Sequence, residues 1–344
     1  MRLTLFGLAI AFAACALVGS AQPASSGSYK VLKTAKVGGV GGFDYVYADE
    51  AGRRLYIPRT GNPARITVFD LDTLAPVGEI ANTNARGAAV SPKSNRGFGS
   101  SKPLSMWDSK TLMPIKTIDV QGGPDGIMYD AFNDRVYVFS HIAPHVTVVN
   151  AADGAVVGTI DLGGMPEQAA SDGKGHLYVD LEDKNKIAVV DAKTLTKTGE
   201  YDLEGKGGTC AGLAMDVKNN ILFATCRNPQ VMVIMSAADG KIITTLPIGT
   251  GTDGAVFNPN TMEAFSSHGD GTLTVVKENS PTSFVVEQTL QTMTGGKTLT
   301  LDSKTNRILV IAAEYTPAPT PPPGGRAGRG QMVPDSFAIL AIGK

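Results

Sequence analysis

The sequence is poor in the residues that most often hold cofactors. Its 344 residues include three cysteines, four histidines and one tryptophan. It has no HExxH zinc motif, no CxxCH haem attachment and no GxSxG nucleophile elbow. The stretch GTGTDG at residues 249–254 matches a dinucleotide pattern, but it runs into an apolar strand, whereas a pyrophosphate needs a helix N-terminus. The sequence therefore predicts no cofactor and assigns no catalytic residue.

Metal ligands are not predicted either. His141 and His145 are four residues apart, which on a helix would favour a metal-binding pair. Pro144 and the alternating segments on either side indicate strands instead. The spacing of these two histidines therefore does not predict a metal site.

Charge and aromatic content argue against a nucleic-acid partner. Lys and Arg total 31, Asp and Glu total 32, and aromatic residues make up 6% of the chain. Single-stranded nucleic acid needs a basic groove with aromatic side chains on which bases stack. Beyond the N-terminus no apolar run is long enough to cross a bilayer, so we expect no membrane span.

The N-terminal residues have the pattern of an export signal. Arg2 precedes an apolar run over residues 3–18, and small residues follow up to Ala21. We expect cleavage after Ala21, which makes residues 1–21 a signal peptide and places the mature protein in the periplasm or outside the cell. A lipoprotein anchor at Cys15 is not favoured, because Phe12 is a poor first residue for that cleavage box.

A repeat of 39 to 45 residues fills the rest of the chain. It is anchored by the residue that closes the first short strand of each unit, namely Asp49, Ser91, Asp130, Ser171, Asp216, Asn258 and Asp302. Each unit contains about four short segments of period-two alternation, separated by Gly, Asn and Asp turns. Four strands at this period are typical of a β-propeller blade. Residues 22–344 are therefore predicted to form an all-β, single seven-bladed β-propeller of four-stranded antiparallel blades.

The seventh unit is one strand short, which predicts how the ring closes. After its second strand comes a Pro/Gly-rich insertion at residues 316–334, then a third strand at residues 336–342 and the chain end. The unused segment 29–37 alternates like a strand, and we expect it to supply the outer strand of the last blade. Arg326 and Arg329 of the insertion either cover the channel as a partial lid or lie in a solvated loop.

The repeats resemble a known family. The phrases RVYVFSHIAPHVTVVNAADGAVVGTIDLGGMPE (residues 135–167) and KIAVVDAKTLTKTGEYDL (residues 186–203) are similar to the YVTN repeat of bacterial exported YncE-like propellers. The resemblance implies the fold but no activity, because the wider superfamily includes quinoprotein amine dehydrogenase subunits, lactonases and nitrite-reductase haem domains. With Trp107 alone, the chain lacks the tryptophan-docking repeats of eight-bladed quinoproteins, so no quinone is expected.

Charged residues are predicted to gather at one mouth of the central channel. Counting back from each anchor places six of them at the start of the first strands, namely Asp44, Arg86, Asp125, Glu167, Asp253 and Lys297. The loops between second and third strands add Arg59, Lys102, His141, Glu182, Arg227, His268 and Glu314 to the same face. The candidate ligand-binding residues are Asp44, Arg59, Arg86, Asp125, His141, Glu167, Asp253, His268, Lys297 and Glu314.

Three interpretations of this mouth remain open. The charges could simply line a watery channel, or they could bind a small polar ligand or a partner protein, with the protein expected to be a monomer. A lactonase-like hydrolase using His268 or Glu167 is the alternative. An enzyme should bring a carboxylate and a histidine within a few ångströms, whereas a binding module should show a broad mouth.

The two cysteines of the mature chain lie in one predicted hairpin. Cys210 and Cys226 sit near its open end, opposite one another or one diagonal step apart. Export permits a disulfide between them, and two buried thiols are the alternative.

Overall fold

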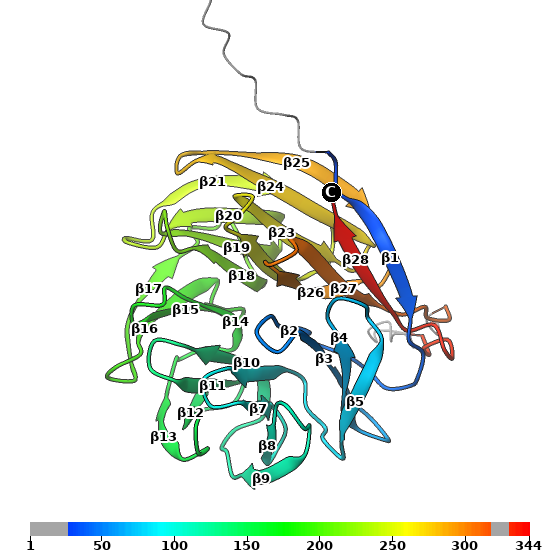
Figure 1. The fold of residues 1–344 in the computed structure, drawn as a ribbon. Helices are drawn as coiled ribbons and strands as arrows, with labels where there is room; N and C mark the ends of the chain where they lie inside the picture. The colour runs from blue at the N-terminus through cyan, green and yellow to red at the C-terminus, as the bar shows by residue number, and fades with distance from the viewer. Residues whose placement is uncertain (1–26, 318–329) are drawn as a thin grey trace, which may run out of the picture.

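The protein is a ring of seven four-stranded antiparallel sheets, described here from a computed structural model that covers residues 27–317 and 330–344. Figure 1 shows the sheets arranged as blades around a central channel, which confirms the predicted seven-bladed propeller. Over the described ranges no helix is long and apolar enough to span a membrane. The predicted signal peptide, Cys15, Arg326 and Arg329 lie outside the described residues.

In blades one to six the chain runs from the channel outwards through four consecutive strands. Blades one to three comprise β2 (Tyr47–Asp49), β3 (Arg54–Arg59), β4 (Arg65–Asp70), β5 (Pro76–Ala81); β6 (Ala88–Ser91), β7 (Arg96–Gly99), β8 (Leu104–Asp108), β9 (Pro114–Ile118); and β10 (Pro124–Asp130), β11 (Arg135–Ser140), β12 (Val146–Asn150), β13 (Val156–Ile160). Blades four to six comprise β14 (Pro166–Ser171), β15 (His176–Leu181), β16 (Lys186–Asp191), β17 (Thr196–Asp202); β18 (Cys210–Asp216), β19 (Ile221–Arg227), β20 (Gln230–Ser236), β21 (Ile242–Pro247); and β22 (Thr252–Asn258), β23 (Glu263–His268), β24 (Thr272–Ser280), β25 (Ser283–Gln291).

Blade seven joins the two ends of the chain. It contains β26 (Lys297–Asp302), β27 (Arg307–Ala312), β28 (Ala338–Gly343) and, as its outer strand, the N-terminal β1 (Lys30–Lys36). β1 pairs antiparallel with β28 from Lys30 opposite Gly343 to Lys36 opposite Ala338, and Figure 1 shows the two strands side by side. This pairing confirms the predicted closure.

Both chain ends are also tied to blade six through one buried carboxylate. Glu263 is 1% exposed; its Oε2 accepts a hydrogen bond from the Tyr29 hydroxyl, and its Oε1 lies 2.7 Å from Lys344 Nζ. The backbone of Tyr29 exchanges two hydrogen bonds of 2.8 Å with the side chain of Gln288 in β25. The outer strand therefore holds blade six as well as blade seven.

The strand pattern follows from which sheet faces are covered. Middle strands such as β11 (RVYVFS) are buried at almost every position, because neighbouring blades pack on both faces. Outer strands such as β13 keep most side chains exposed. The apolar layers therefore lie between blades, where Trp107 packs against Tyr56 with ring centroids 5.8 Å apart. This packing holds the first strands around the channel and so fixes the position of the mouth.

Candidate functional site

Charged side chains from blades one to four form a chain of contacts along one side of the channel mouth. Arg86 lies 3.3 Å from Asp44 and 3.6 Å from Asp125. The Nε2 atom of His141 lies 3.4 Å from Asp125 and 3.5 Å from Glu167. The repeat spacing predicted one face for these residues, and the structure brings them into contact from the starts of β10 and β14 and from the β11–β12 loop.

The chain of contacts continues through blades four to seven and returns to its start. Arg227 lies 3.5 Å from Glu182 and 2.5 Å from Asp253, and Lys297 lies 2.5 Å from Asp253 and 3.3 Å from Asp44. We call the complete set the mouth ring; its members are Asp44, Arg86, Asp125, His141, Glu167, Glu182, Arg227, Asp253 and Lys297. The ring contains more carboxylates than permanent cations.

The negative charge of the mouth ring is concentrated in blades three and four. Burial, followed by the charge of Asp44, raises the pKa of Asp125 to about 6. The pKa of Glu182 is raised first by burial and then by the neighbouring charge of Glu167. A nearby cation stabilises the ionised form of a carboxyl group whose pKa burial has raised. The acidic part of the mouth therefore favours a positively charged partner.

Two cavities open at the mouth. The larger has a volume of about 950 Å³, and its lining includes Arg227, Asp253, Met293, Lys297, Glu314 and Tyr315. The smaller, of about 470 Å³, is lined in part by Asp44, Arg86 and Lys102. Small-molecule sites usually have volumes of about 300–1,000 Å³ and contain a few polar groups of fixed direction. The larger cavity has both properties.

Below the mouth ring the channel contains a cavity of about 200 Å³, lined in part by Tyr45 and Gln168, two side chains that sequence reasoning missed. The Tyr45 hydroxyl donates a 2.9 Å hydrogen bond to Glu167 Oε2. The side-chain oxygen of Gln168 accepts hydrogen bonds from the backbone amides of Leu213 (3.0 Å) and Ala255 (2.9 Å), which joins blades four, five and six. Both side chains hold the floor of the mouth in place, and neither has a motif by which the sequence could reveal it.

Two of the predicted mouth residues do not face the mouth. Arg59 is 1% exposed and stacks 3.7 Å from the centroid of the Phe337 ring. His268 is completely buried, its Nδ1 lies 3.0 Å from Thr272 Oγ1, and burial lowers its pKa to about 4. The reason is that Arg59 and His268 are the sixth residues of β3 and β23, whereas Arg227 is the seventh residue of β19, and successive side chains of a strand point to opposite faces. Glu314 is exposed and lines the larger cavity.

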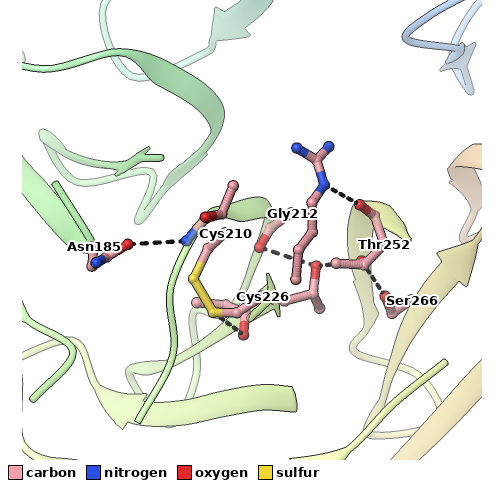
Figure 2. The surroundings of a disulfide bond; sticks show 10 residues. Asn185, Cys210, Gly212, Cys226, Thr252 and Ser266 are labelled. Carbon is pink, nitrogen blue, oxygen red and sulfur yellow. Dashed lines mark hydrogen bonds between the residues drawn. A yellow bond between two sulfur atoms is a disulfide. The ribbon is translucent and has the colours of Figure 1, made fainter. Parts of the chain in front are cut away.

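A disulfide lies next to Arg227, a member of the mouth ring. Cys210 and Cys226 are paired across β18 and β19, and their sulfurs are bonded (Figure 2). Arg227 follows Cys226, and its Nε donates a 3.0 Å hydrogen bond to the carbonyl of Thr252, which directs the guanidinium towards Asp253. The cross-link therefore stiffens the strand that presents Arg227.

The ends of the insertion lie at the rim of the larger cavity. The backbone amide of Val333 donates to the carbonyl of Glu314 (2.8 Å), and that of Thr316 donates to Gln331 (2.8 Å). Both Glu314 and Tyr315 line the cavity. The segment between these ends includes residues outside the described ranges, so the predicted roles of its arginines stay predictions.

Comparison with known proteins identifies the fold and nothing finer. No protein-family model and no curated protein matches the chain. The crystal structure of RRP9 WD40 repeats matches with a TM-score of 0.72 at 10% identity, over 92% of this chain and 97% of that one. A chain in the crystal structure of the mitotic checkpoint complex matches with a TM-score of 0.70 at 12% identity, over 82% and 91%. The chain thus shares the seven-bladed propeller fold of these structures, and the fold by itself does not name a function.

Proposed function

We propose that this protein is an exported, YncE-like binding module that holds a small zwitterionic molecule in the larger cavity at the channel mouth. The observation that carries the proposal is the convergence of two cations and two carboxylates on one cavity of about 950 Å³. Arg227 and Lys297 offer donors to a ligand carboxylate, and Asp253 and Glu314 offer acceptors to a ligand ammonium group.

One cation of this cavity, Arg227, keeps hydrogen-bonding capacity for a ligand. Arg227 uses Nε for Thr252 and one terminal nitrogen for Asp253, while its other terminal nitrogen donates only a long hydrogen bond of 3.5 Å to Glu182. Its side chain is 33% exposed. A guanidinium held in this way is already oriented, so a ligand carboxylate can bind without reorganising it.

Replacing Arg227 with Gln is expected to abolish ligand binding without unfolding the protein. In a thermal-shift screen of small carboxylates, amines and amino acids, the parent should be stabilised by a zwitterion, by about 5 °C at a hundredfold excess over Kd. The Arg227→Gln variant should lose that shift. The matched control is Arg96→Gln, which removes an arginine of similar exposure (32%) paired with Asp108, away from the mouth.

Two results of the screen would contradict the proposal. One is equal loss of the ligand shift in the Arg227 and Arg96 variants, and the other is stabilisation by amines alone. A response to no small molecule would favour a protein partner on the same face, the other use to which propeller scaffolds are put.

A hydrolase is the second candidate, and one observation favours it. His141 lies between Asp125 and Glu167, so a histidine and two carboxylates converge as an enzyme would require. His268, the histidine first considered for this role, is buried and faces none of them. If this candidate is correct, the parent should open simple lactones, as measured by acid release, and His141→Gln should be inactive. Activity that persists in His141→Gln would eliminate this assignment.

A further inference from the structure

Three potential metal ligands converge in blades three and four. Asp125, His141 and Glu167 each offer one ligand atom, and these atoms all lie within 4.8 Å of one another. The separations from His141 Nε2, 3.4 Å to Asp125 Oδ2 and 3.5 Å to Glu167 Oε1, are too long for hydrogen bonds. Ligands bound to a tetrahedral Zn²⁺ at about 2.0–2.1 Å lie about 3.3 Å from each other. The two separations from His141 Nε2 are therefore close to those of ligands around a cation.

Two polar atoms of this group are buried without a hydrogen-bond partner, namely His141 Nε2 and Asp125 Oδ1, the oxygen on the side away from His141. Asp125 is 8% exposed, and its Oδ1 makes no hydrogen bond; Arg86 Nε is 3.6 Å away. His141 Nε2 is likewise buried without a hydrogen-bond partner. A buried polar atom without a partner costs about 1–3 kcal/mol, more for a charged group, so native proteins rarely keep two in neighbouring side chains unless something binds them.

The surrounding residues hold two of these ligands in fixed positions. The Tyr45 hydroxyl binds Glu167 Oε2, which leaves Oε1 directed at His141. The hydroxyl of Ser100 donates to the backbone carbonyl of Asp125. Hydrogen bonds of this kind are the usual support of metal-binding side chains, because they fix orientation before the ion arrives.

One further carboxyl group, that of Glu182, increases the negative potential at the same place. Glu182 belongs to the mouth ring beside Glu167. Asp180, in β15, is completely buried without a hydrogen-bond partner on either oxygen, and burial raises its pKa well above the usual range, which favours the neutral acid. The period-two alternation of a strand puts Asp180 on the same face as Tyr178, which packs between blades four and five. His141 therefore lies near three ionisable carboxyl groups, those of Asp125, Glu167 and Glu182, which is more than one ion pair needs.

We propose that Asp125, His141 and Glu167 bind one divalent transition-metal cation of the zinc type, with open coordination positions towards the mouth. The imidazole nitrogen favours Zn²⁺ and its neighbours over Ca²⁺ and Mg²⁺, which prefer oxygen ligands only. Three protein ligands leave at least one position for water or a ligand atom. The cation site is in blades three and four, whereas Arg227 and Lys297 come from blades five and seven, so it does not depend on the proposed zwitterion.

The other histidine–carboxylate pairs provide matched controls. His176 lies 2.8 Å from Asp172, and His145 lies 2.7 Å from Asp161. Within the described part of the chain, only the Asp125 group brings a histidine together with two carboxylates in this way. A single carboxylate and a histidine are too few ligands for tight binding, so the His176 pair should not contribute a zinc site.

Isothermal titration of the full mature chain, purified without a histidine tag and freed of metal, tests the proposal. ZnCl₂ should bind at one site per chain, and CaCl₂ should bind at least about tenfold more weakly. The His141→Gln variant should lose at least about tenfold in zinc affinity. The His176→Gln and Arg227→Gln variants should bind zinc like the parent.

Three outcomes would overturn the proposal: no saturable zinc binding, unchanged affinity in His141→Gln, or an equal loss in His176→Gln. His141 is partly exposed, so its replacement should leave the melting curve unchanged. The Asp125→Asn variant tests a second proposed ligand and should also bind zinc more weakly. If Asp125→Asn does not fold, the result for His141→Gln alone decides the proposal. Failure of zinc binding leaves the zwitterion proposal intact, because Arg227→Gln tests that proposal separately.

Discussion

A chain that begins at Gly38 is expected to unfold cooperatively and far more easily than one that begins at Gly27. The shorter chain lacks β1, so β28 loses its ladder partner from Lys30 to Lys36 and becomes an open edge. Glu263 also loses the Tyr29 hydroxyl, and the buried Tyr29 ring is removed. We expect the loss of these contacts together to lower the free energy of unfolding by about 5 kcal/mol or more.

Urea denaturation followed by circular dichroism measures this loss. The chain that begins at Gly27 is the matched reference, since it keeps β1 complete. A second comparison, Tyr29→Phe in the longer chain, isolates the hydroxyl on Glu263 and should cost less than the whole deletion. Equal denaturation midpoints for the two truncated chains would show that the N-terminal strand does not close the ring.

Replacing Lys297 with Met should destabilise the protein by about 2 kcal/mol at pH 8, because it leaves two partly buried carboxylates without their shared cation. Lys297 lies between Asp44 and Asp253, and its side chain is 19% exposed. Burial raises the pKa of Asp44 and Lys297 lowers it, so removing the lysine raises this pKa further. A carboxyl whose pKa is higher in the folded than in the unfolded protein becomes less destabilising as the pH falls. The difference from the parent should therefore shrink between pH 8 and pH 5.

Thermal unfolding at both pH values provides the measurement. The control is Lys186→Met, which removes an exposed lysine paired with Glu200 on the outer strands of blade four. That variant should melt like the parent at either pH. A Lys297→Met deficit that grew towards pH 5 would contradict the assigned role of Asp44 and Asp253.

The fold could be predicted because each blade repeats a local pattern. The closing residues from Asp49 to Asp302 recur at nearly constant spacing, and each lies at the end of a channel strand in the structure. The same spacing predicted that Asp44, Asp125 and Lys297 lie on one face. Residues at the same position in successive repeats lie at the same height along the channel axis. Closure by residues 29–37 followed from a missing strand and an open edge.

The direction of individual side chains could not be predicted in the same way. Arg59 and His268 were expected in loops, but each is the sixth residue of its strand, one place before the position of Arg227 in β19, so its side chain points to the opposite face. The contact of His141 with Glu167 joins two different blades, and no spacing within one repeat encodes it. Asp180 did leave a signal, a charged residue inside the apolar strand HLYVDL, which a search for buried carboxylates would find.

The central claim is that the mouth ring and its larger cavity form the ligand-binding surface. The most direct test is a crystal structure of the protein soaked with the amino acid that stabilises it best in the thermal-shift screen. The account predicts ligand density in the cavity, with the carboxylate within hydrogen-bond distance of Arg227 and Lys297 and the ammonium group facing Asp253 or Glu314. Density bound only at the outer strands or at the opposite face of the ring would contradict it.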